Sequence, residues 1–388
     1  MAENSKSKFA EREEAILEFW RLEKIFAKTL SKPSPKGEFI FYDGPPFATG
    51  LPHYGHILAG TIKDVIPRYK TMQGYHVPRR WGWDCHGLPV ENIVEKELNL
   101  GTKKDIVSYG IDKFNEAASQ RVLRFAFDWK KIVPRMGRFV DMDDDYRTMD
   151  TTYTESIWWA FSELYKKGLM YEGFKSMHIC PRCETTLSNF EVSQGYKDIT
   201  DISVYVKFEV KPKSPSINSG QPKTYVLGWT TTPWTLPGNA ALAVNPDINY
   251  AKFKIPDPNF ENQLFIAAKN LLPRIIKDGK YEIVEEIKGK ELIGLSYIPP
   301  FGYYFNDKNL KNRENGWKVY GADFVTTNDG TGIVHIAPSF GEDDYQLSTL
   351  HDLPFIQHVD LSGQFKKEVR DFALKKVKPK ENTQETDI

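Results

Sequence analysis

A strand, loop and helix pattern near the N-terminus constrains the fold of this 388-residue chain more than any other feature. The run EFIFYDG has the length and apolar content of a short strand and ends in turn residues. The Gly/Pro-rich loop PPFATGLPHYGH follows it, and apolar residues then recur at helical intervals in HILAGTIKDVIPRYKTMQG. This order predicts the first unit of an α/β nucleotide-binding sheet.

The chain changes character at about residue 186. From there to about residue 345, short β-rich runs such as DISVYVKFEV, KTYVLGWTTT and TGIVHIAP are separated by Pro, Gly and Asn turns. Many short strands favour a closed, β-barrel-like domain. At roughly 150 residues per domain the length allows two to three domains. We expect two, an α/β domain over residues 1–185 and a β-rich domain over residues 186–388.

A helix-like segment before this change is rich in aromatic residues. Residues 153–171 place five apolar side chains on one helical face, namely Ile157, Trp158, Phe161, Leu164 and Tyr165. Large apolar side chains are more often buried than polar ones. The pattern therefore predicts a helix that packs into the protein core.

Charge gives no global clue to a partner, because 52 Lys and Arg residues balance 52 Asp and Glu residues. One local stretch, residues 61–80, carries five cations against Asp64 alone, namely Lys63, Arg68, Lys70, Arg79 and Arg80. This stretch is either an ordinary solvated helix face or a patch that binds a polyanion.

The chain contains three cysteines, Cys85, Cys180 and Cys183, which are too few for a disulfide framework and favour a reducing compartment. The N-terminal residues lack the apolar stretch of a signal peptide, and no run of about 18 apolar residues occurs. We therefore expect a cytoplasmic protein that makes no membrane contact.

The sharpest local signal is the tetrapeptide His53-Tyr54-Gly55-His56 at the start of the predicted helix. Backbone N–H groups and the helix dipole at a helix N-terminus favour phosphate, and imidazoles three residues apart lie on adjoining parts of the first turn. Two donors would then face a triphosphate. Taken alone, two histidines at this spacing are more often surface residues or metal ligands.

Four sequence blocks together resemble one enzyme family. PPFATGLPHYGH and GWDCHGLPVE (82–91) are similar to the signature blocks of class I aminoacyl-tRNA synthetases, and within that class to the isoleucyl group. In the β-rich half, WTTTPWTLPGN (229–239) and GTGIVHIAPSFGEDD (330–344) resemble the threonine-rich and aspartate elements of the family's editing domain. The resemblance implies an α/β protein with a Rossmann-like parallel nucleotide-binding half-fold and an inserted β-barrel-like editing domain.

The resemblance also implies an activity and its residues. The family activates isoleucine with ATP, bound together with Mg²⁺ as substrate, and transfers it to tRNA-Ile. His53 and His56 would stabilise the charge that develops on phosphate oxygens. Asp84 would hold the α-ammonium of isoleucine by a charge-assisted hydrogen bond, and Gly44 and Pro45 would line the side-chain pocket through backbone contacts.

An energy argument explains why such an enzyme needs a second site. One methylene separates isoleucine from valine by only about 1 to 3 kcal/mol, a limit for which isoleucyl-tRNA synthetase is itself the standard example. A smaller site must therefore hydrolyse valyl-tRNA. The resemblance assigns that site to residues that suit ribose, ester, water and ammonium: Thr230, Thr231, Thr232, Asn239, His335 and Asp344.

Cys180 and Cys183 form one CxxC pair, which is half of the four ligands that a structural zinc needs. Zn²⁺ would therefore require further ligands beyond Ile388. The chain has no KMSKS-like loop and no anticodon-binding helical domain. We expect the N-terminal portion of a longer ligase, monomeric at full length, with little or no activation by itself.

Two alternatives stay open at this point. Besides part of a ligase, the chain could be a stand-alone editing hydrolase that acts on mischarged tRNA, or a non-catalytic tRNA-binding fragment that uses the basic stretch 61–80.

Overall fold

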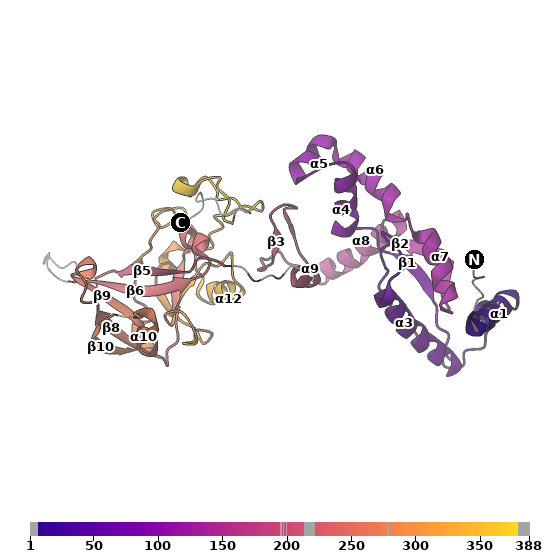
Figure 1. The fold of residues 1–388 in the computed structure, drawn as a ribbon, viewed down its shortest axis with the longest axis horizontal. Helices are drawn as coiled ribbons and strands as arrows, with labels where there is room; N and C mark the ends of the chain where they lie inside the picture. The colour runs from indigo at the N-terminus through magenta and orange to yellow at the C-terminus, as the bar shows by residue number, and fades with distance from the viewer. Residues whose placement is uncertain are drawn as a thin grey trace, which may run out of the picture. The chain divides into compact units, whose positions relative to one another are not determined.

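The computed structural model describes residues 7–194, 196, 198, 200–212, 222–277 and 279–378. The chain divides into two compact units, Met1–Glu172 and Gly173–Ile388 (Figure 1). The predicted domains 1–185 and 186–388 place their division later in the chain, and this division stays a prediction. No helix in the described ranges is long and apolar enough to cross a membrane.

The first unit is built around parallel strand pairing. Strand β1 (Arg80–Trp83) pairs in parallel with β2 (Asp141–Arg147). Isolated parallel bridges join Glu38 to His76 and Phe47 to Asp84. The segment predicted as a strand, residues 38–44, holds only the first of these bridges, at Glu38, and does not form a strand. Parallel pairing together with helices confirms the α/β class, while the Rossmann-like topology stays a prediction.

Helices make up most of the rest of the first unit, from indigo to magenta in Figure 1. They are α1 (Lys8–Leu22), α2 (Ile25–Ser31), α3 (Tyr54–Met72), α4 (Leu88–Glu97), α5 (Lys103–Tyr109), α6 (Ile111–Val122), α7 (Ala126–Arg135) and α8 (Thr151–Lys166).

The core of the first unit is a tryptophan cluster beside β1. Trp81 and Trp83 of β1 meet edge to face at 5.3 Å between ring centroids, and Trp129 of α7 lies 5.9 Å from each of them. All three side chains are buried. This cluster packs α7 against β1. It also supports the loop before α3, because Ala48 of that loop is buried in the same cluster.

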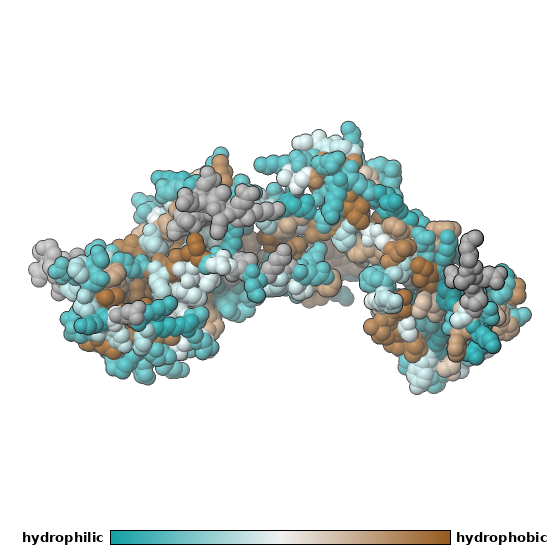
Figure 2. Space-filling model, viewed as in Figure 1, coloured by the Kyte–Doolittle hydropathy of each residue, from teal (hydrophilic) through white to brown (hydrophobic). Residues whose placement is uncertain are grey.

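Helices α3 and α8 of this unit expose apolar side chains. The prediction that residues 153–171 form a core helix is wrong in one respect: α8 is helical, but none of its residues is buried, and Trp158 is 70% exposed. Leu58 and Val65 of α3 are exposed as well, and Figure 2 shows hydrophobic surface over α3. Helical periodicity aligned these side chains on a face, but the described part of the chain does not cover that face.

The second unit contains two larger sheets and a small hairpin, β3 (Ile179–Cys180) with β4 (Thr185–Thr186). The six-stranded sheet has the order β10-β8-β9-β6-β5-β11 and is antiparallel except for the parallel pair β6 and β9. The three-stranded sheet has the order β12-β7-β13. The strands are β5 (Val204–Val210), β6 (Lys223–Thr230), β7 (Ala241–Val244), β8 (Asn249–Lys254), β9 (Gln263–Ala268), β10 (Glu282–Lys288), β11 (Tyr297–Ile298), β12 (Val319–Gly321) and β13 (Ile333–Ile336).

Short helical segments connect these strands. They are α9 (Asn189–Gln194), η1 (Pro233–Gly238), η2 (Pro258–Phe260), η3 (Lys269–Leu271), α10 (Leu272–Ile275), α11 (Gly289–Leu292), η4 (Arg313–Asn315), α12 (Glu342–His351) and η5 (Arg370–Phe372).

The main core of the second unit draws on both of its larger sheets. Phe208 of β5 and Tyr250 of β8 pack in one cluster with Leu242 of β7 and Ile333 of β13, and all four are buried. Leu236 of η1 belongs to the same cluster, so this turn is anchored in the core. The many short strands predicted for this half are present, while closure into a barrel stays a prediction.

Candidate functional site

The histidine pair of the first unit lies at the start of α3, where it forms the helix cap. The backbone N–H of Gly55 donates to Nδ1 of His53 at 3.1 Å, and the backbone N–H of His53 donates to Nδ1 of His56 at 3.2 Å. The two imidazole rings lie 3.8 Å apart between centroids. The pair therefore satisfies two helix N-terminal donors that would otherwise lack partners.

This capping selects one form of each ring. An imidazole nitrogen that accepts a hydrogen bond carries no proton, so a neutral ring must carry its proton on Nε2. Burial, together with the electrostatic influence of the nearby His53 ring and the Lys63 ammonium, lowers the pKa of His56 and keeps that ring neutral at pH 7. His53 is exposed and His56 is half-buried. The arrangement therefore presents Nε2–H donors at the positive end of a helix dipole.

The glycine between the two histidines is required by close packing. A Cβ atom on Gly55 would lie 2.9 Å from Cε1 of His53, closer than side-chain atoms normally approach. Any other residue at this position would displace the His53 ring from its cap.

The loop before α3 borders a cavity of about 430 Å³. Its lining residues come from the loop and from α3: Gly44, Pro46, Phe47, Thr49, Gly50, Leu51, His53, His56 and Lys63. Pro45 and Asp84 do not line it. Asp84 is nevertheless held beside the loop, because its backbone N–H donates to the Pro46 carbonyl at 2.9 Å. Oδ1 of Asp84 accepts from the backbone N–H of His86 at 3.3 Å.

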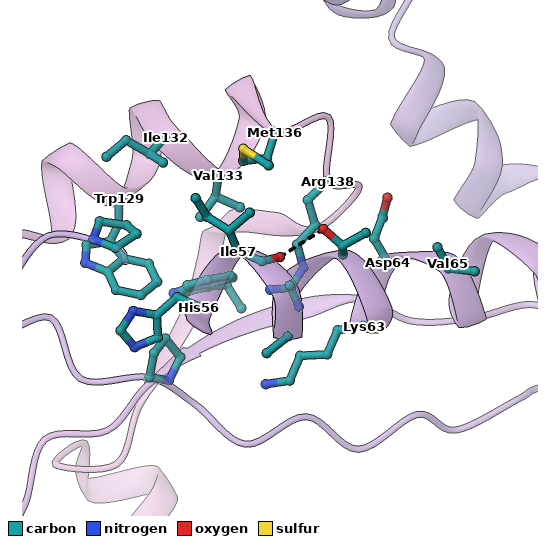
Figure 3. A pocket seen from close by; sticks show the side chains of 16 residues that line it. His56, Ile57, Lys63, Asp64, Val65, Trp129, Ile132, Val133, Met136 and Arg138 are labelled. Atoms are coloured by element: carbon teal, nitrogen blue, oxygen red, sulfur yellow. Dashed lines mark hydrogen bonds between the residues drawn. The ribbon is translucent and has the colours of Figure 1, made fainter. Parts of the chain in front are cut away.

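A second, smaller cavity of about 120 Å³ lies between α3 and α7 and shares His56 and Lys63 with the first (Figure 3). Lys63 forms an ion pair with Asp43, and its Nζ donates to the Gly44 carbonyl at 3.1 Å. Arg138 donates to Asp43 at 2.7 Å. Sequence reasoning gave no role to this cluster of Asp43, Lys63 and Arg138. One signal could have pointed to it, since Lys63 follows His56 by two helical turns.

The basic stretch 61–80 does not form a free cationic patch. Three of its five cations form ion pairs within the first unit: Lys63 with Asp43, Arg68 with Asp64, and Arg80 with Asp144. Lys70 lies over the rings of Phe39 and Tyr75. Arg79 is buried and donates to the hydroxyls of Thr29 and Thr71. These contacts fit an ordinary helix face better than a patch that binds a polyanion.

The threonines of the second unit lie where β6 passes into η1. The Thr230 hydroxyl accepts from the backbone N–H of Thr232 at 3.0 Å, and the two hydroxyl oxygens are 3.2 Å apart. Thr230 is buried, Thr232 is half-buried and Thr231 is exposed. The structure therefore brings Thr230 and Thr232 together and leaves Thr231 facing solvent.

A directed chain of hydrogen bonds holds the turn that follows. Nδ2 of Asn239 donates to Nδ1 of His335 at 3.1 Å, so the neutral ring carries its proton on Nε2 and donates it to Oγ1 of Thr235 at 2.7 Å. The Thr235 hydroxyl then donates to the Thr232 carbonyl at 2.8 Å. Tyr297 fixes the amide by donating to Oδ1 of Asn239 at 2.6 Å.

These hydrogen bonds give Asn239 and His335 partners within the protein. Asn239 is 2% exposed, and its amide nitrogen also donates to the Ala241 carbonyl. Burial lowers the pKa of His335 to about 3, so the ring is neutral at pH 7. Thr235 and Tyr297, which the sequence did not predict as site residues, also form hydrogen bonds in this network. Thr235 stands inside the threonine-rich block and could have been found there, whereas Tyr297 comes from a distant strand with no local signal.

Asp344 lies in the first turn of α12, shortly after the strand that carries His335. Its Oδ1 accepts from the backbone N–H of Ala337 at 2.7 Å. Burial raises the pKa of Asp344 to about 6 in spite of this bond. The carboxylate is therefore ionised at pH 7.5 and above while largely surrounded by protein.

Cys180 and Cys183 lie together at the β3–β4 hairpin, with the backbone N–H of Cys183 3.5 Å from Sγ of Cys180. Within the described residues, no group of three or more His, Cys, Asp or Glu side chains is placed to hold a metal ion. Two thiols alone do not complete a tetrahedral zinc site.

Comparison with known proteins identifies the class. A family profile described as tRNA synthetases class I (I, L, M and V) matches residues 15–296. The chain belongs to this family of class I aminoacyl-tRNA synthetases.

Within the family, the chain is similar to isoleucine–tRNA ligases. It is 48% identical to the isoleucine–tRNA ligase of Treponema denticola, over 94% of this chain and 35% of that protein. It is 45% identical to the probable cytoplasmic isoleucine–tRNA ligase of Dictyostelium discoideum (98% and 35%) and 47% identical to the enzyme of Bdellovibrio bacteriovorus (95% and 34%). The predicted resemblance to the isoleucyl group is confirmed, and the chain spans about 35% of the length of these relatives.

Similarity to solved structures is weaker. The editing domain of the P. knowlesi cytosolic leucyl-tRNA synthetase aligns with 37% of this chain and 60% of that chain, at 18% identity and a TM-score of 0.29. Similarity this low does not establish a shared fold.

Proposed function

We propose that the chain acts in an isoleucine–tRNA ligase, which uses ATP to join isoleucine to tRNA-Ile and hydrolyses valyl-tRNA formed in error. The observation that carries the first part is the pair of Nε2–H donors that the His53 and His56 cap presents at the N-terminus of α3. We propose that this unit is the first half of a Rossmann-like nucleotide-binding fold over residues 1–185.

In the activation step, a carboxylate oxygen of isoleucine attacks the α-phosphorus of ATP. The new oxygen–phosphorus bond forms as the bond to pyrophosphate breaks, and negative charge grows on the phosphate oxygens. No proton has to be removed, so the step needs aligned donors and no base. Neutral His53 and His56 supply such donors, and the loss of one well-placed donor typically costs roughly 3 to 4 kcal/mol of transition-state stabilisation.

The amino acid would lie beside the loop at Gly44 and Pro45. Lys63 holds the Gly44 carbonyl, and Asp84 is fixed next to Pro46 by its backbone hydrogen bond. Only one hydrogen bond to the Asp84 carboxylate is found among the described residues, which leaves acceptor capacity for the α-ammonium group. Asp84 is therefore our proposed ammonium ligand.

Mg²⁺ would enter with the phosphates of ATP, where it neutralises part of their charge. The described side chains of this unit offer hydrogen-bond donors to the phosphates and no cluster of carboxylates to a metal. A structural Zn²⁺ does not fit Cys180 and Cys183 as described, because they provide two ligands of the four that the ion needs.

In the editing step, the oxygen of a water molecule attacks the ester carbon of valyl-tRNA. The bond from that carbon to the ribose oxygen breaks, and the ribose oxygen takes up a proton. We propose that Thr230, Thr231 and Thr232 orient ribose, ester and water, and that ionised Asp344 anchors the ammonium of valine. Asn239 and His335 would position the threonines without contacting the substrate, because their polar atoms already take part in the hydrogen bonds that hold Thr232 and Thr235.

Release of valine from valyl-tRNA-Ile by the 388-residue chain tests the editing part, with isoleucyl-tRNA-Ile as the control substrate. We expect faster release of valine than of isoleucine. Equilibrium binding of a non-hydrolysable isoleucyl-adenylate mimic tests the activation part. A chain that neither releases valine faster than buffer nor binds the mimic would overturn the proposal.

One observation favours a second candidate, a stand-alone editing hydrolase. Every proposed editing residue lies in the second compact unit, which has its own core. Valine release without any binding of ATP, isoleucine or the mimic would favour this candidate. A tRNA-binding fragment that relies on residues 61–80 has no such support, because three of the five cations there form ion pairs within the unit and Arg79 is buried.

A further inference from the structure

A second buried histidine, His358, contacts the same turn that His335 holds. Its side chain is 0% exposed, and Nε2 lies 2.9 Å from the carbonyl oxygen of Trp234 in η1. A carbonyl oxygen only accepts, so Nε2 of His358 must carry the proton and donate it. This hydrogen bond joins residue 358 to the residue immediately before Thr235.

The ring of His358 also packs directly on the end of η1. A Cβ atom on Gly238 would lie 2.3 Å from Nδ1 of His358, so the imidazole occupies the space that a side chain at 238 would need. Phe340 meets the His358 ring edge to face at 4.8 Å, and Phe365 stacks on it at 6.0 Å. These contacts fix the ring on both the first and the last part of the turn.

A histidine is energetically unfavourable at this position, because it buries a polar atom without a partner in the described part of the chain. Nδ1 of His358 has no hydrogen-bond partner among the described residues. Burial lowers the pKa of the ring to about 4, so it stays neutral at pH 7. A leucine or methionine would fill the space without burying an unpaired acceptor. The N–H donated to Trp234 is the feature of histidine that an apolar residue lacks.

We propose that His358 is a positioning residue for the editing site. Its hydrogen bond to Trp234 and its packing on Gly238 hold η1 in place, and Thr235 and Asn239, which adjoin these two residues, are thereby held for the contacts with His335 and Thr232 described above. This inference rests on the proposed editing function and adds a residue that neither sequence block contains.

Two variants separate a positioning role from simple filling of the core. His358→Gln keeps an N–H at a similar reach, whereas His358→Met keeps the volume and removes the donor. His351→Gln is the matched control, because His351 also packs on an aromatic ring, that of Tyr320 at 4.5 Å, but forms no hydrogen bond or ring contact with η1 among the described residues. Valine release from valyl-tRNA-Ile is measured over a range of substrate concentrations, with thermal unfolding of each variant alongside.

A misplaced group lowers the rate of the bound complex more than substrate affinity. We expect His358→Met to lower kcat by about 10- to 100-fold with KM changed by less than about threefold. His358→Gln should restore most of kcat, and His351→Gln should match the parent chain. Equal losses in His358→Gln and His358→Met, or a change in KM alone, would overturn the proposal.

A second readout does not depend on activity. Amide hydrogen exchange reports the η1 hydrogen bonds from Thr235 N–H to Thr232 and from Asn239 N–H to Leu236, both 3.0 Å long. We expect exchange at these amides to accelerate in His358→Met and to stay near the parent rate in His358→Gln. If the parent chain releases no valine, the proposed function fails, and unchanged exchange in His358→Met would separately refute the positioning role.

Discussion

The two units use pairs of neutral histidines in opposite ways. In the first unit, Nδ1 of both His53 and His56 accepts a backbone hydrogen bond at the start of α3, and we propose that the opposite nitrogens donate to a ligand. In the second unit, His335 and His358 are buried, and their N–H groups are donated to Thr235 and Trp234. We propose that the outward donors of the first pair recognise a ligand, whereas the donors of the second pair hold the protein's own backbone and side chains in place.

The packing beneath each pair explains the difference. The core of the first unit is a compact tryptophan cluster, and the apolar faces of α3 and α8 stay exposed. The second unit has a core shared by its two larger sheets, and Leu236 anchors the threonine turn in that core. A site built on such a core can be shaped from buried groups, whereas the first pair caps a helix end at the surface, where His56 meets Trp129 of the tryptophan cluster at 4.9 Å between ring centroids.

If the two sites are separate, the largest effect of a single change should be confined to one of them. We expect Asp344→Ala to slow valine release from valyl-tRNA-Ile by about 100-fold or more, because loss of one member of a buried charge pair costs about 2 to 5 kcal/mol. Binding of the isoleucyl-adenylate mimic, measured by calorimetry, should be unchanged. Normal valine release in this variant would remove Asp344 from the proposed site.

The reverse change should act only on the first unit. We expect His56→Ala to weaken binding of the isoleucyl-adenylate mimic by about 10- to 100-fold, the typical effect of one hydrogen bond to a charged group. His56→Gln, which keeps an N–H near the position of Nε2, should recover part of the affinity. Valine release is the control and should not change. An effect of equal size on both measurements would contradict the separation of the two sites.

Asp344 should reduce stability while it serves function. Its folded pKa, about 6, lies above the ordinary carboxyl value of 3.8, so the folded state binds the extra proton between these values and loses stability as pH rises through this window. We expect Asp344→Asn to raise the free energy of unfolding by about 1 to 3 kcal/mol at pH 8, with a smaller gain at pH 5. Urea unfolding at both pH values measures this, and a gain that is larger at pH 5 would contradict the assignment.

A smaller effect should follow from crowding at the helix cap. Gly55→Ala would push a Cβ atom against the His53 ring, and we expect the affinity for the isoleucyl-adenylate mimic to fall by about 10-fold, equivalent to one displaced hydrogen bond. Alanine also favours the helix by up to about 1 kcal/mol, so the stability of the unit should not fall. Gly60→Ala is the matched control in the same helix, where the nearest atom to a new Cβ lies at 3.8 Å. Equal affinities of the two variants would argue against the role of the cap.

The smallest effect should come from the exposed face of α8. We expect Trp158→Gln to change the free energy of unfolding by less than about 0.5 kcal/mol, since surface changes are usually within that range. Trp83→Ala in the tryptophan cluster should instead cost about 3 to 5 kcal/mol. Chemical unfolding of both variants makes the comparison, and a large loss in Trp158→Gln would show that α8 is packed after all.

Sequence pattern predicted local structure better than it predicted surroundings. The helix after the HYGH block begins at Tyr54, where the histidines and the change to helical spacing placed it. The expected strand at 38–44, by contrast, is reduced to one isolated bridge at Glu38, and the aromatic helix predicted for a core is exposed. Periodicity shows which side chains share a face, but what covers that face depends on contacts distant in sequence.

The sequence by itself determined the family, the helix that begins at the histidine pair, and the presence of two threonine- and aspartate-containing blocks in a β-rich half. Only the tertiary structure decided what these residues touch. It gave Asn239 and His335 partners within the protein and paired Lys63 with Asp43. It also showed that Thr235, Tyr297 and His358 hold η1 and the residues beside it. The reason is physical: local chemistry sets how a helix is capped, whereas burial and hydrogen-bond direction arise only when segments far apart in the chain are packed together.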